Sequence, residues 1–257
     1  MHGRFTAARA SKPHVPRSRS GGRRIEPQRP GVRGIRTYGI DRDGIEVPGQ
    51  DSKRERWDLF EAEAAYADSM LRSAIGDTEG CIQALERAVE IKPDYAPAVL
   101  SLGSVEYQRE RTAQGRTLFL SLLSMPDDTP DWVEIVDAAG DFLIQSGEYA
   151  DALELYRGAA ARSPAVGVFH QGIGCCASHL GQHEEAPAAS RRALEIEPEN
   201  QKFVNDLGWS LIESGALQEA RTVLERAVAM DSSDALAREN LRICNQRIAK
   251  RRPKKKD

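Results

Sequence analysis

From residue 51 onward the chain alternates hydrophobic and polar residues as amphipathic helices do, and Gly and Pro interrupt the helical runs at regular intervals. Glycines at 76, 147, 181 and 215 are separated by 71, 34 and 34 residues, and prolines at 93, 164 and 198 by 71 and 34. Each Gly is expected to end one helix at a tight turn, and each Pro to end the helix that follows. The 71-residue gap holds another pair of helical runs, with three extra residues around 124–131. The pattern predicts helix pairs that repeat every 34 residues.

Small residues recur at three places in five units that begin near Ala62, Ala96, Val133, Gly167 and Gln201. The first place holds Ser69, Gly103, Gly140, Gly174 and Gly208; the second holds Cys81, Gly115, Ala152, Ala186 and Ala220; the third holds Ala88, Leu122, Ala159, Ala193 and Ala227. Two helix backbones approach closely only where side chains are small, so these places predict helix–helix contacts. Leu122 and the modest Cys81 are the two exceptions.

This arrangement resembles the tetratricopeptide repeat family, whose units are 34-residue antiparallel helix pairs with a Gly at the turn and a Pro near the end. The resemblance covers roughly residues 57–234. It implies an all-α fold, a right-handed α-solenoid of stacked antiparallel helix pairs, over residues 51–249. The units lie near 62–95, 96–132, 133–166, 167–200 and 201–234. The second unit departs from the family pattern, with Glu110 in place of the turn Gly and Leu122 at a small position.

Residues 235–249 are expected to form one amphipathic helix that covers the end of the stack. Its apolar side would consist of Leu236, Leu241, Ile243 and Ile248, with charged residues elsewhere. Such a helix closes a repeat array because it presents a polar outer face to water.

The resemblance also implies a function: the first helices of successive units line a concave groove that accepts a peptide or protein segment. Carried over position by position, the candidate groove residues are Tyr66, Met70, Leu100, Tyr107, Glu134, Asp137, Asp141, Gln145, Gln171, Cys175, His179, Asn205, Trp209, Ile212 and Glu213. Chaperone-binding members hold a carboxylate with a clamp of Lys, Arg and Asn residues at such positions, and that clamp is absent here. An acidic groove favours a partner with Lys or Arg, although the acids could equally serve only to keep the array soluble.

Charge is distributed unevenly along the 257 residues, whose net charge is −3. Residues 1–40 hold ten Lys or Arg against one acid, and residues 250–257 hold six against one, so the body between them is strongly acidic. Residues 1–50 are rich in Gly, Pro and Arg and lack periodicity, which predicts a disordered tail. The basic ends leave several interpretations open: phosphate contacts with nucleic acid, a membrane surface, a nuclear import signal in 250–256, a solvated tail, or an overextended gene start.

Reactive side chains cluster in residues 170–183, where Cys175 and His179 share a helix face. Metal binding or redox chemistry is one interpretation of this cluster. The simpler interpretation is small core cysteines beside surface histidines. No phosphate-binding loop, nucleophile elbow, H-E-x-x-H motif or dinucleotide-binding turn is present. The sequence therefore predicts no catalytic residues, no metal and no cofactor.

The leading hypothesis is a non-enzymatic, cytoplasmic protein-interaction scaffold without membrane insertion. The alternative is a nucleic-acid-associated protein whose basic tails bind phosphates. The identity of the partner and the oligomeric state stay open at this point.

Overall fold

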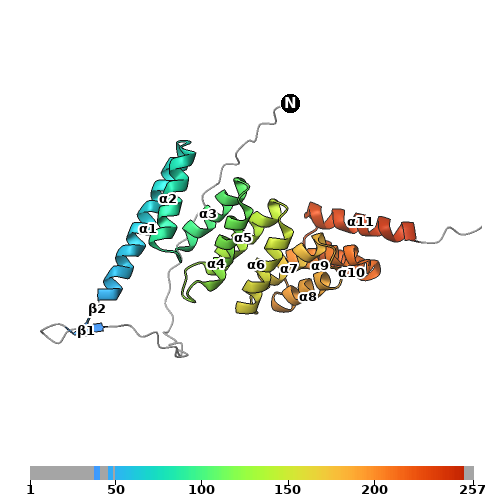
Figure 1. The fold of residues 1–257 in the computed structure, drawn as a ribbon. Helices are drawn as coiled ribbons and strands as arrows, with labels where there is room; N and C mark the ends of the chain where they lie inside the picture. Colours follow the sequence, from blue (N-terminus) through green and yellow to red (C-terminus); the bar gives the residue numbers. More distant parts are fainter. Residues whose placement is uncertain (1–37, 41–45, 49, 252–257) are drawn as a thin grey trace, which may run out of the picture.

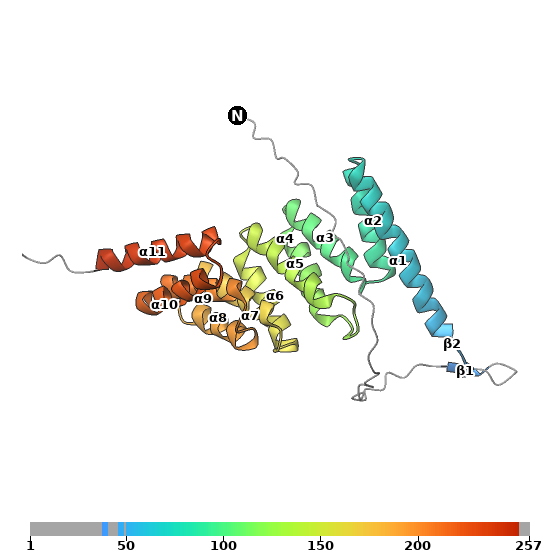
Figure 2. The same cartoon turned by 180° about the vertical axis from the view of Figure 1, so that it is seen from behind.

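Eleven α-helices succeed one another along an elongated array in the part of the chain that the structure, a computed structural model, describes: residues 38–40, 46–48 and 50–251. The helices advance in sequence order from α1 and α2 at one end to α9, α10 and α11 at the other, in both views (Figures 1 and 2). Consecutive helices pack against each other, except that α4 and α5 are linked through the 3₁₀ segment between them, and the first helix of most units also contacts the first helix of the following unit. The predicted all-α solenoid of stacked antiparallel helix pairs is confirmed.

The helices are grouped in pairs, with one 3₁₀ segment and a final single helix. Their bounds are α1 Gln50–Ala74 and α2 Thr78–Ile91; α3 Ala96–Gln108, α4 Thr112–Ser121 and the 3₁₀ helix η1 Leu122–Ser124; α5 Trp132–Gln145 and α6 Tyr149–Arg162; α7 Gly167–His179 and α8 Glu185–Ile196; α9 Gln201–Ser214 and α10 Leu217–Met230; and α11 Ala235–Arg251.

Two short strands precede the helices within the segment expected to be disordered. β1 (Tyr38–Ile40) pairs antiparallel with β2 (Glu46–Pro48), with Gly39 opposite Val47. Three residue pairs are too few to produce a visible alternation, so sequence periodicity did not detect this hairpin. The remainder of the predicted N-terminal tail, and residues 252–257 of the basic C-terminal tail, lie outside the described residues.

The turns inside the helix pairs explain the Gly spacing. Gly76, Gly147, Gly181 and Gly215 have φ between 70° and 83°, a left-handed conformation that glycine adopts without steric cost. At each turn two backbone N–H groups bond back to carbonyls of the preceding helix, which closes its C-terminus. The second unit builds the same turn with Glu110 at a φ of 62°. Glu110 therefore holds a strained conformation for a residue with a Cβ.

Replacing Glu110 with glycine is expected to raise the free energy of unfolding by about 1 kcal/mol, because a left-handed conformation costs an L-residue roughly that much. Urea denaturation followed by circular dichroism measures the change. Gly147→Ala is the matched control at an equivalent turn, and should lower stability by about the same amount. A Glu110→Gly variant less stable than the wild type would contradict this account.

Glycines on first helices let a large side chain from the second helix lie directly against the backbone. A Cβ added to Gly140 would overlap the ring of Tyr156, and one added to Gly103 would lie 2.5 Å from Phe119 Cε1. Of the fifteen predicted small positions, fourteen are buried and only Cys81 is partly exposed. The small residues recur because close packing of the helices requires them.

Leu122 changes the second unit locally because its large side chain occupies a small-residue position. Helix α4 ends at Ser121, and the chain continues as η1 with Leu122 fully buried. The Leu122 carbonyl accepts a 2.7 Å hydrogen bond from Trp132 Nε1, and the Arg162 guanidinium lies 4.1 Å from the centre of that ring. The inserted residues thus bridge the second and third units.

Helix α11 closes the C-terminal end with a different face from the one predicted. Ala237, Asn240, Cys244 and Ile248 are buried, whereas the side chain of Leu236 is 59% exposed. Asn240 Nδ2 donates a 3.0 Å hydrogen bond to Asn205 Oδ1 of α9. The predicted apolar stripe was wrong at Leu236 because a small residue, Ala237, allows α11 to pack closely on the last pair.

Candidate functional site

Three first helices, α5, α7 and α9, lie side by side and bring polar side chains together in the middle of the array. α5 contributes Asp137 and Asp141, α7 contributes Gln171, and α9 contributes Lys202 and Asp206. We call these five residues the acidic surface. Gln171 Nε2 donates a 2.8 Å hydrogen bond to Asp206 Oδ2, which links α7 to α9. The Tyr156 hydroxyl, from α6, donates to Asp137 Oδ1 at 3.0 Å.

Two carboxyl groups of the acidic surface have raised pKa values. Burial is the main cause for Asp137, with repulsion from Asp141 in addition; the Tyr156 hydrogen bond and the Lys202 charge act in the opposite direction. Burial also raises the pKa of Asp206, against its hydrogen bond to Gln171 and the charge of Lys202. The charged form of each group is therefore poorly solvated in the folded protein. Lys202 compensates only part of the negative charge.

The structure divides the sequence-predicted groove residues by exposure. Met70, Glu134, Asp141, Gln145 and His179 are exposed, and Tyr66, Leu100, Asp137, Gln171, Cys175, Trp209 and Glu213 are partly exposed. Tyr107, Asn205 and Ile212 are buried. These last three cannot offer their side chains to a partner, so we remove them from the candidate contact surface.

Each of the three buried residues is covered by another part of the chain. The position of a residue within its repeat does not reveal this covering. Tyr107 packs against Phe119 and Phe142, and its hydroxyl donates a 2.7 Å hydrogen bond to Asp151 Oδ2 of α6. Ile212 belongs to the hydrophobic cluster beneath α10 and α11. Asn205 is engaged by Asn240 of α11.

Some accessible candidates already have partners outside the acidic surface. The imidazole of His179 stacks on the ring of Tyr149 with centroids 4.1 Å apart. Glu213 Oε1 lies 2.9 Å from Arg247 Nη2 of α11. The rings of Tyr66 and Tyr95 are in edge contact at the N-terminal end. Of the predicted set, the structure gathers Asp137, Asp141, Gln171 and Cys175 at one place, with Glu134 one turn before Asp137 on α5.

Asp206 and Lys202 belong to this place but were missing from the sequence-derived candidates. Asp206 directly follows Asn205, and both stand at groove positions of the repeat, so position alone could not choose between them. Lys202 stands at the second position of its unit. Its proximity to the acidic side chains becomes visible only in the folded structure.

The surroundings of Cys175 and Cys176 do not favour metal binding or redox chemistry. Burial raises the pKa of Cys175 to about 11 and that of Cys176 to about 12, so both are protonated thiols near neutral pH. A thiol attacks or binds metal as its thiolate. No three His, Cys, Asp or Glu side chains lie close enough to share a metal ion within the described residues.

None of the described helices is long and apolar enough to cross a bilayer.

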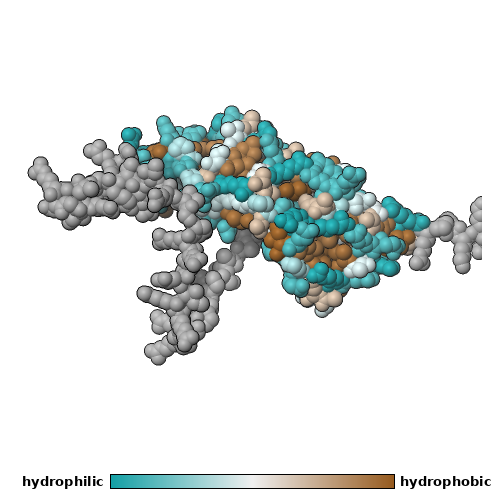
Figure 3. All heavy atoms as spheres, turned by 90° about the horizontal axis from the view of Figure 1, so that it is seen from below, coloured by the Kyte–Doolittle hydropathy of each residue, from teal (hydrophilic) through white to brown (hydrophobic). Residues whose placement is uncertain are grey.

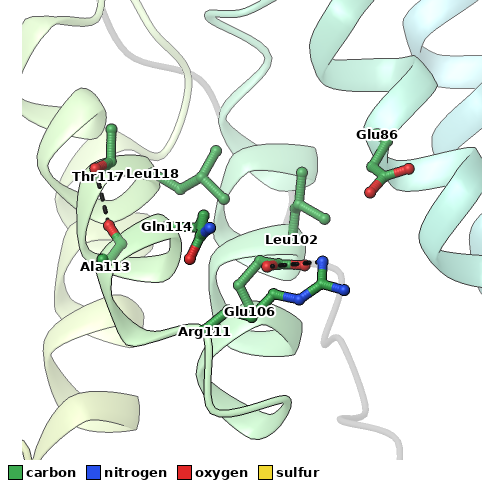
Figure 4. Close-up of a pocket in the computed structure, with 8 residues that line it drawn as sticks. All are labelled: Glu86, Leu102, Glu106, Arg111, Ala113, Gln114, Thr117 and Leu118. Carbon is green, nitrogen blue, oxygen red and sulfur yellow. Dashed lines mark hydrogen bonds and ion pairs between the residues drawn. The ribbon is translucent and has the colours of Figure 1, made fainter.

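A separate pocket of about 560 Å³ lies between α2 and the α3–α4 pair (Figure 4). Leu102 and Leu118 give it apolar walls, and Glu86 faces them from α2. The buried Glu106 carboxylate pairs with Arg111 at 3.6 Å, while its Oε1 has no hydrogen-bond partner among the described residues. None of the predicted groove residues lines this pocket.

Hydrophobic side chains are distributed in separate patches over the surface. On the face drawn in Figure 3, brown apolar patches alternate with teal polar ones, and no continuous apolar groove appears. This face therefore presents both polar and apolar side chains.

Tetratricopeptide repeat family models match three parts of the chain, residues 62–95, 138–201 and 179–241. Together these segments cover more than half of the sequence. They include the acidic surface except for Asp137.

Two curated proteins show similarity over part of their length. The chain is 27% identical over 116 residues to the small glutamine-rich tetratricopeptide repeat-containing protein 2 of Mycosarcoma maydis, covering 45% of this chain and 33% of that protein. It is 25% identical over 158 residues to the CTR9 homolog of Arabidopsis thaliana, covering 61% of this chain and 11% of that protein. The chain thus spans a third or less of these relatives.

Solved structures of low sequence identity share the fold. YrrB, described as a TPR protein with an unusual peptide-binding site, has a TM-score of 0.50 and 17% identity, covering 74% of this chain and 97% of that one. Residues 41 to the end of MamA from Desulfovibrio magneticus RS-1 have a TM-score of 0.50 and 16% identity, covering 68% and 97%.

Proposed function

Because the chain belongs to the tetratricopeptide repeat family, a family of protein-interaction repeats, we propose that it is a non-enzymatic scaffold that binds a protein segment carrying Lys or Arg side chains. The segment contacts the acidic surface formed by α5, α7 and α9. Peptide binding by a similarly folded protein, YrrB, is consistent with this role.

The observation that carries the proposal is the convergence of Asp137, Asp141 and Asp206 from α5 and α9 on one surface, where burial raises the pKa of Asp137 and Asp206. A carboxyl group whose pKa is raised on folding lowers stability above that pKa, and the cost disappears as the pH falls through it. Two neighbouring groups on the same surface therefore reduce stability at neutral pH. Groups kept at such a cost mark functional sites more often than ordinary surface charges do.

A cationic side chain from a partner would remove this cost. An ammonium or guanidinium group placed among Asp137, Asp141 and Asp206 replaces the solvation that burial takes away. Lys202 already plays part of this role within the chain. An incoming Lys or Arg would complete the neutralisation of the acidic surface.

The test is a peptide array in which the number of Lys and Arg residues varies, probed with the full chain, followed by fluorescence anisotropy with the tightest labelled peptide. The double variant Asp137→Lys, Asp141→Lys is expected to bind about 30-fold more weakly or worse, because losing a partly buried charge pair costs about 2 kcal/mol or more. Wild-type binding should also weaken on acidification, because the raised pKa of Asp137 and Asp206 makes these groups protonate earlier than ordinary aspartates.

The matched control is Glu90→Lys, Glu184→Lys, which makes the same change in net charge at exposed positions on the second-helix side of the array. It should bind within about twofold of the wild type, since exposed charges distant from the ligand are screened by salt. Equal losses in the two double variants would show attraction by net charge alone. Unchanged binding by a folded Asp137→Lys, Asp141→Lys variant would place the partner elsewhere.

A further inference from the structure

Helix α1 carries large apolar side chains on the side that faces away from the array. Trp57, Phe60 and Leu71 are 64%, 60% and 68% exposed, and the exposed Ala64 and Ala67 lie between them. We call these five residues the outer stripe. Their spacing places them on one side of a helix with 3.6 residues per turn. Small buried residues, Ala62, Ala65 and Ser69, occupy the opposite side and pack toward the array.

The two ends of the array are therefore closed differently. At the C-terminal end α11 covers the last pair, and most of its exposed side chains are charged. At the N-terminal end α1 is the outermost described helix (Figures 1 and 2). Large apolar side chains are exposed on its outward face. A terminal repeat needs a polar outer face to remain soluble as a monomer. The outer stripe is apolar and does not provide such a polar face.

The outer stripe is large enough for a specific contact. With the 80% exposed Ile75 at the end of α1, it presents roughly 500 Å² of apolar side-chain surface, taking the usual areas of such residues. Two copies of this surface would bury about 1,000 Å², which is the lower bound for a stable interface. Patches of this size on soluble proteins mark interaction sites.

The spacing of the outer stripe is that of a helix–helix seam. Trp57, Ala64 and Leu71 recur every seven residues, and Phe60 and Ala67 stand three residues after the first two of them, which are the a and d positions of a heptad. The central alanines let a second helix approach closely, while the large residues fill the wider ends. This pattern fits another α-helix better than an extended peptide.

Charged residues flank the outer stripe and have partners within α1. Arg54 lies 4.0 Å from Asp58, and Asp68 pairs with Arg72 at 2.7 Å. The exposed apolar area, which two copies can bury together, is therefore the feature that favours a second copy as the occupant.

We propose that this protein forms a symmetric dimer in which the outer stripe of α1 packs against the outer stripe of α1 in a second copy. The acidic surfaces then lie on two arrays joined at their N-terminal ends. A partner with two basic segments would bind such a dimer more tightly than a monomer, because the second contact becomes intramolecular.

Sedimentation velocity and light scattering on the full chain, from about 1 to 100 µM, test the proposal over the affinities expected for an interface of this size. The wild type is expected to be a dimer at the upper end of this range. Trp57→Glu, Leu71→Glu should raise the dissociation constant at least about 100-fold, because both residues contribute large exposed apolar side chains to the contact. Met70→Lys, Leu236→Lys is the matched control: both residues are exposed and apolar but lie outside the outer stripe.

Circular dichroism should show equal helicity in all variants, since every changed side chain is at least half exposed. A wild type that stays monomeric throughout the range would overturn the proposal. So would a dimer that survives Trp57→Glu, Leu71→Glu, or one that the control pair disrupts equally.

Discussion

Replacing Tyr156 with alanine is expected to lower the free energy of unfolding by about 3–5 kcal/mol, the usual cost of truncating a buried aromatic residue. Tyr156 is fully buried and extends from α6 against two neighbouring first helices. A Cβ added to either Gly140 of α5 or Gly172 of α7 would collide with its ring. Because Gly140 and Gly172 carry no side chain that could fill the space left by the ring, the cavity should persist. Urea denaturation and amide hydrogen exchange measure the loss.

Tyr156→Phe separates the hydroxyl from the ring. It keeps the packing but removes the hydrogen bond to Asp137, and should cost about 1–2 kcal/mol. It should also raise the pKa of Asp137 further, because that hydrogen bond favours the charged carboxylate. The pKa can be followed by NMR of the Asp137 side chain. Tyr149→Ala, at a partly buried tyrosine in the first turn of the same helix, is the control and should cost less. A Tyr156→Ala variant within 1 kcal/mol of the wild type would refute the packing argument.

The second large effect is expected at the C-terminal helix. Truncating Ile248 to alanine should destabilise the last helix pair by about 2–4 kcal/mol, because Ile248 packs into the cluster that contains Leu211 and Leu217. Leu236→Ala is the matched control on the same helix and should change stability by less than about 0.5 kcal/mol, since Leu236 is largely exposed.

Hydrogen exchange distinguishes a local effect from a global one. In a repeat array each unit contacts only its neighbours, so protection should fall in α9, α10 and α11 while α3 to α6 keep theirs. Uniform loss of protection along the array would mean that the helices unfold as one unit. Equal effects of Ile248→Ala and Leu236→Ala would contradict the observed orientation of α11.

The candidate site was only partly predictable from the sequence. Repeat positions correctly identified the helices that carry Asp137, Asp141 and Gln171, because a 34-residue period repeats the same orientation in each unit. The same counting included Tyr107 and Ile212, which are buried. Their burial comes from residues of neighbouring units, Phe142 and the helices α10 and α11, whose side chains vary from unit to unit. Position within a repeat does not contain that information.

By itself, the sequence determined the repeat, the helix pairing and the turns. These depend on local chemistry: glycine tolerates a left-handed φ at Gly147, and small side chains such as Ala152 permit close helix packing. Only the tertiary structure decided which groove residues remain accessible, that Asp206 joins Asp137 across three helices, and that α1 turns Trp57 outward. Burial and electrostatic coupling are sums over contacts between units, so they exist only after the units have stacked.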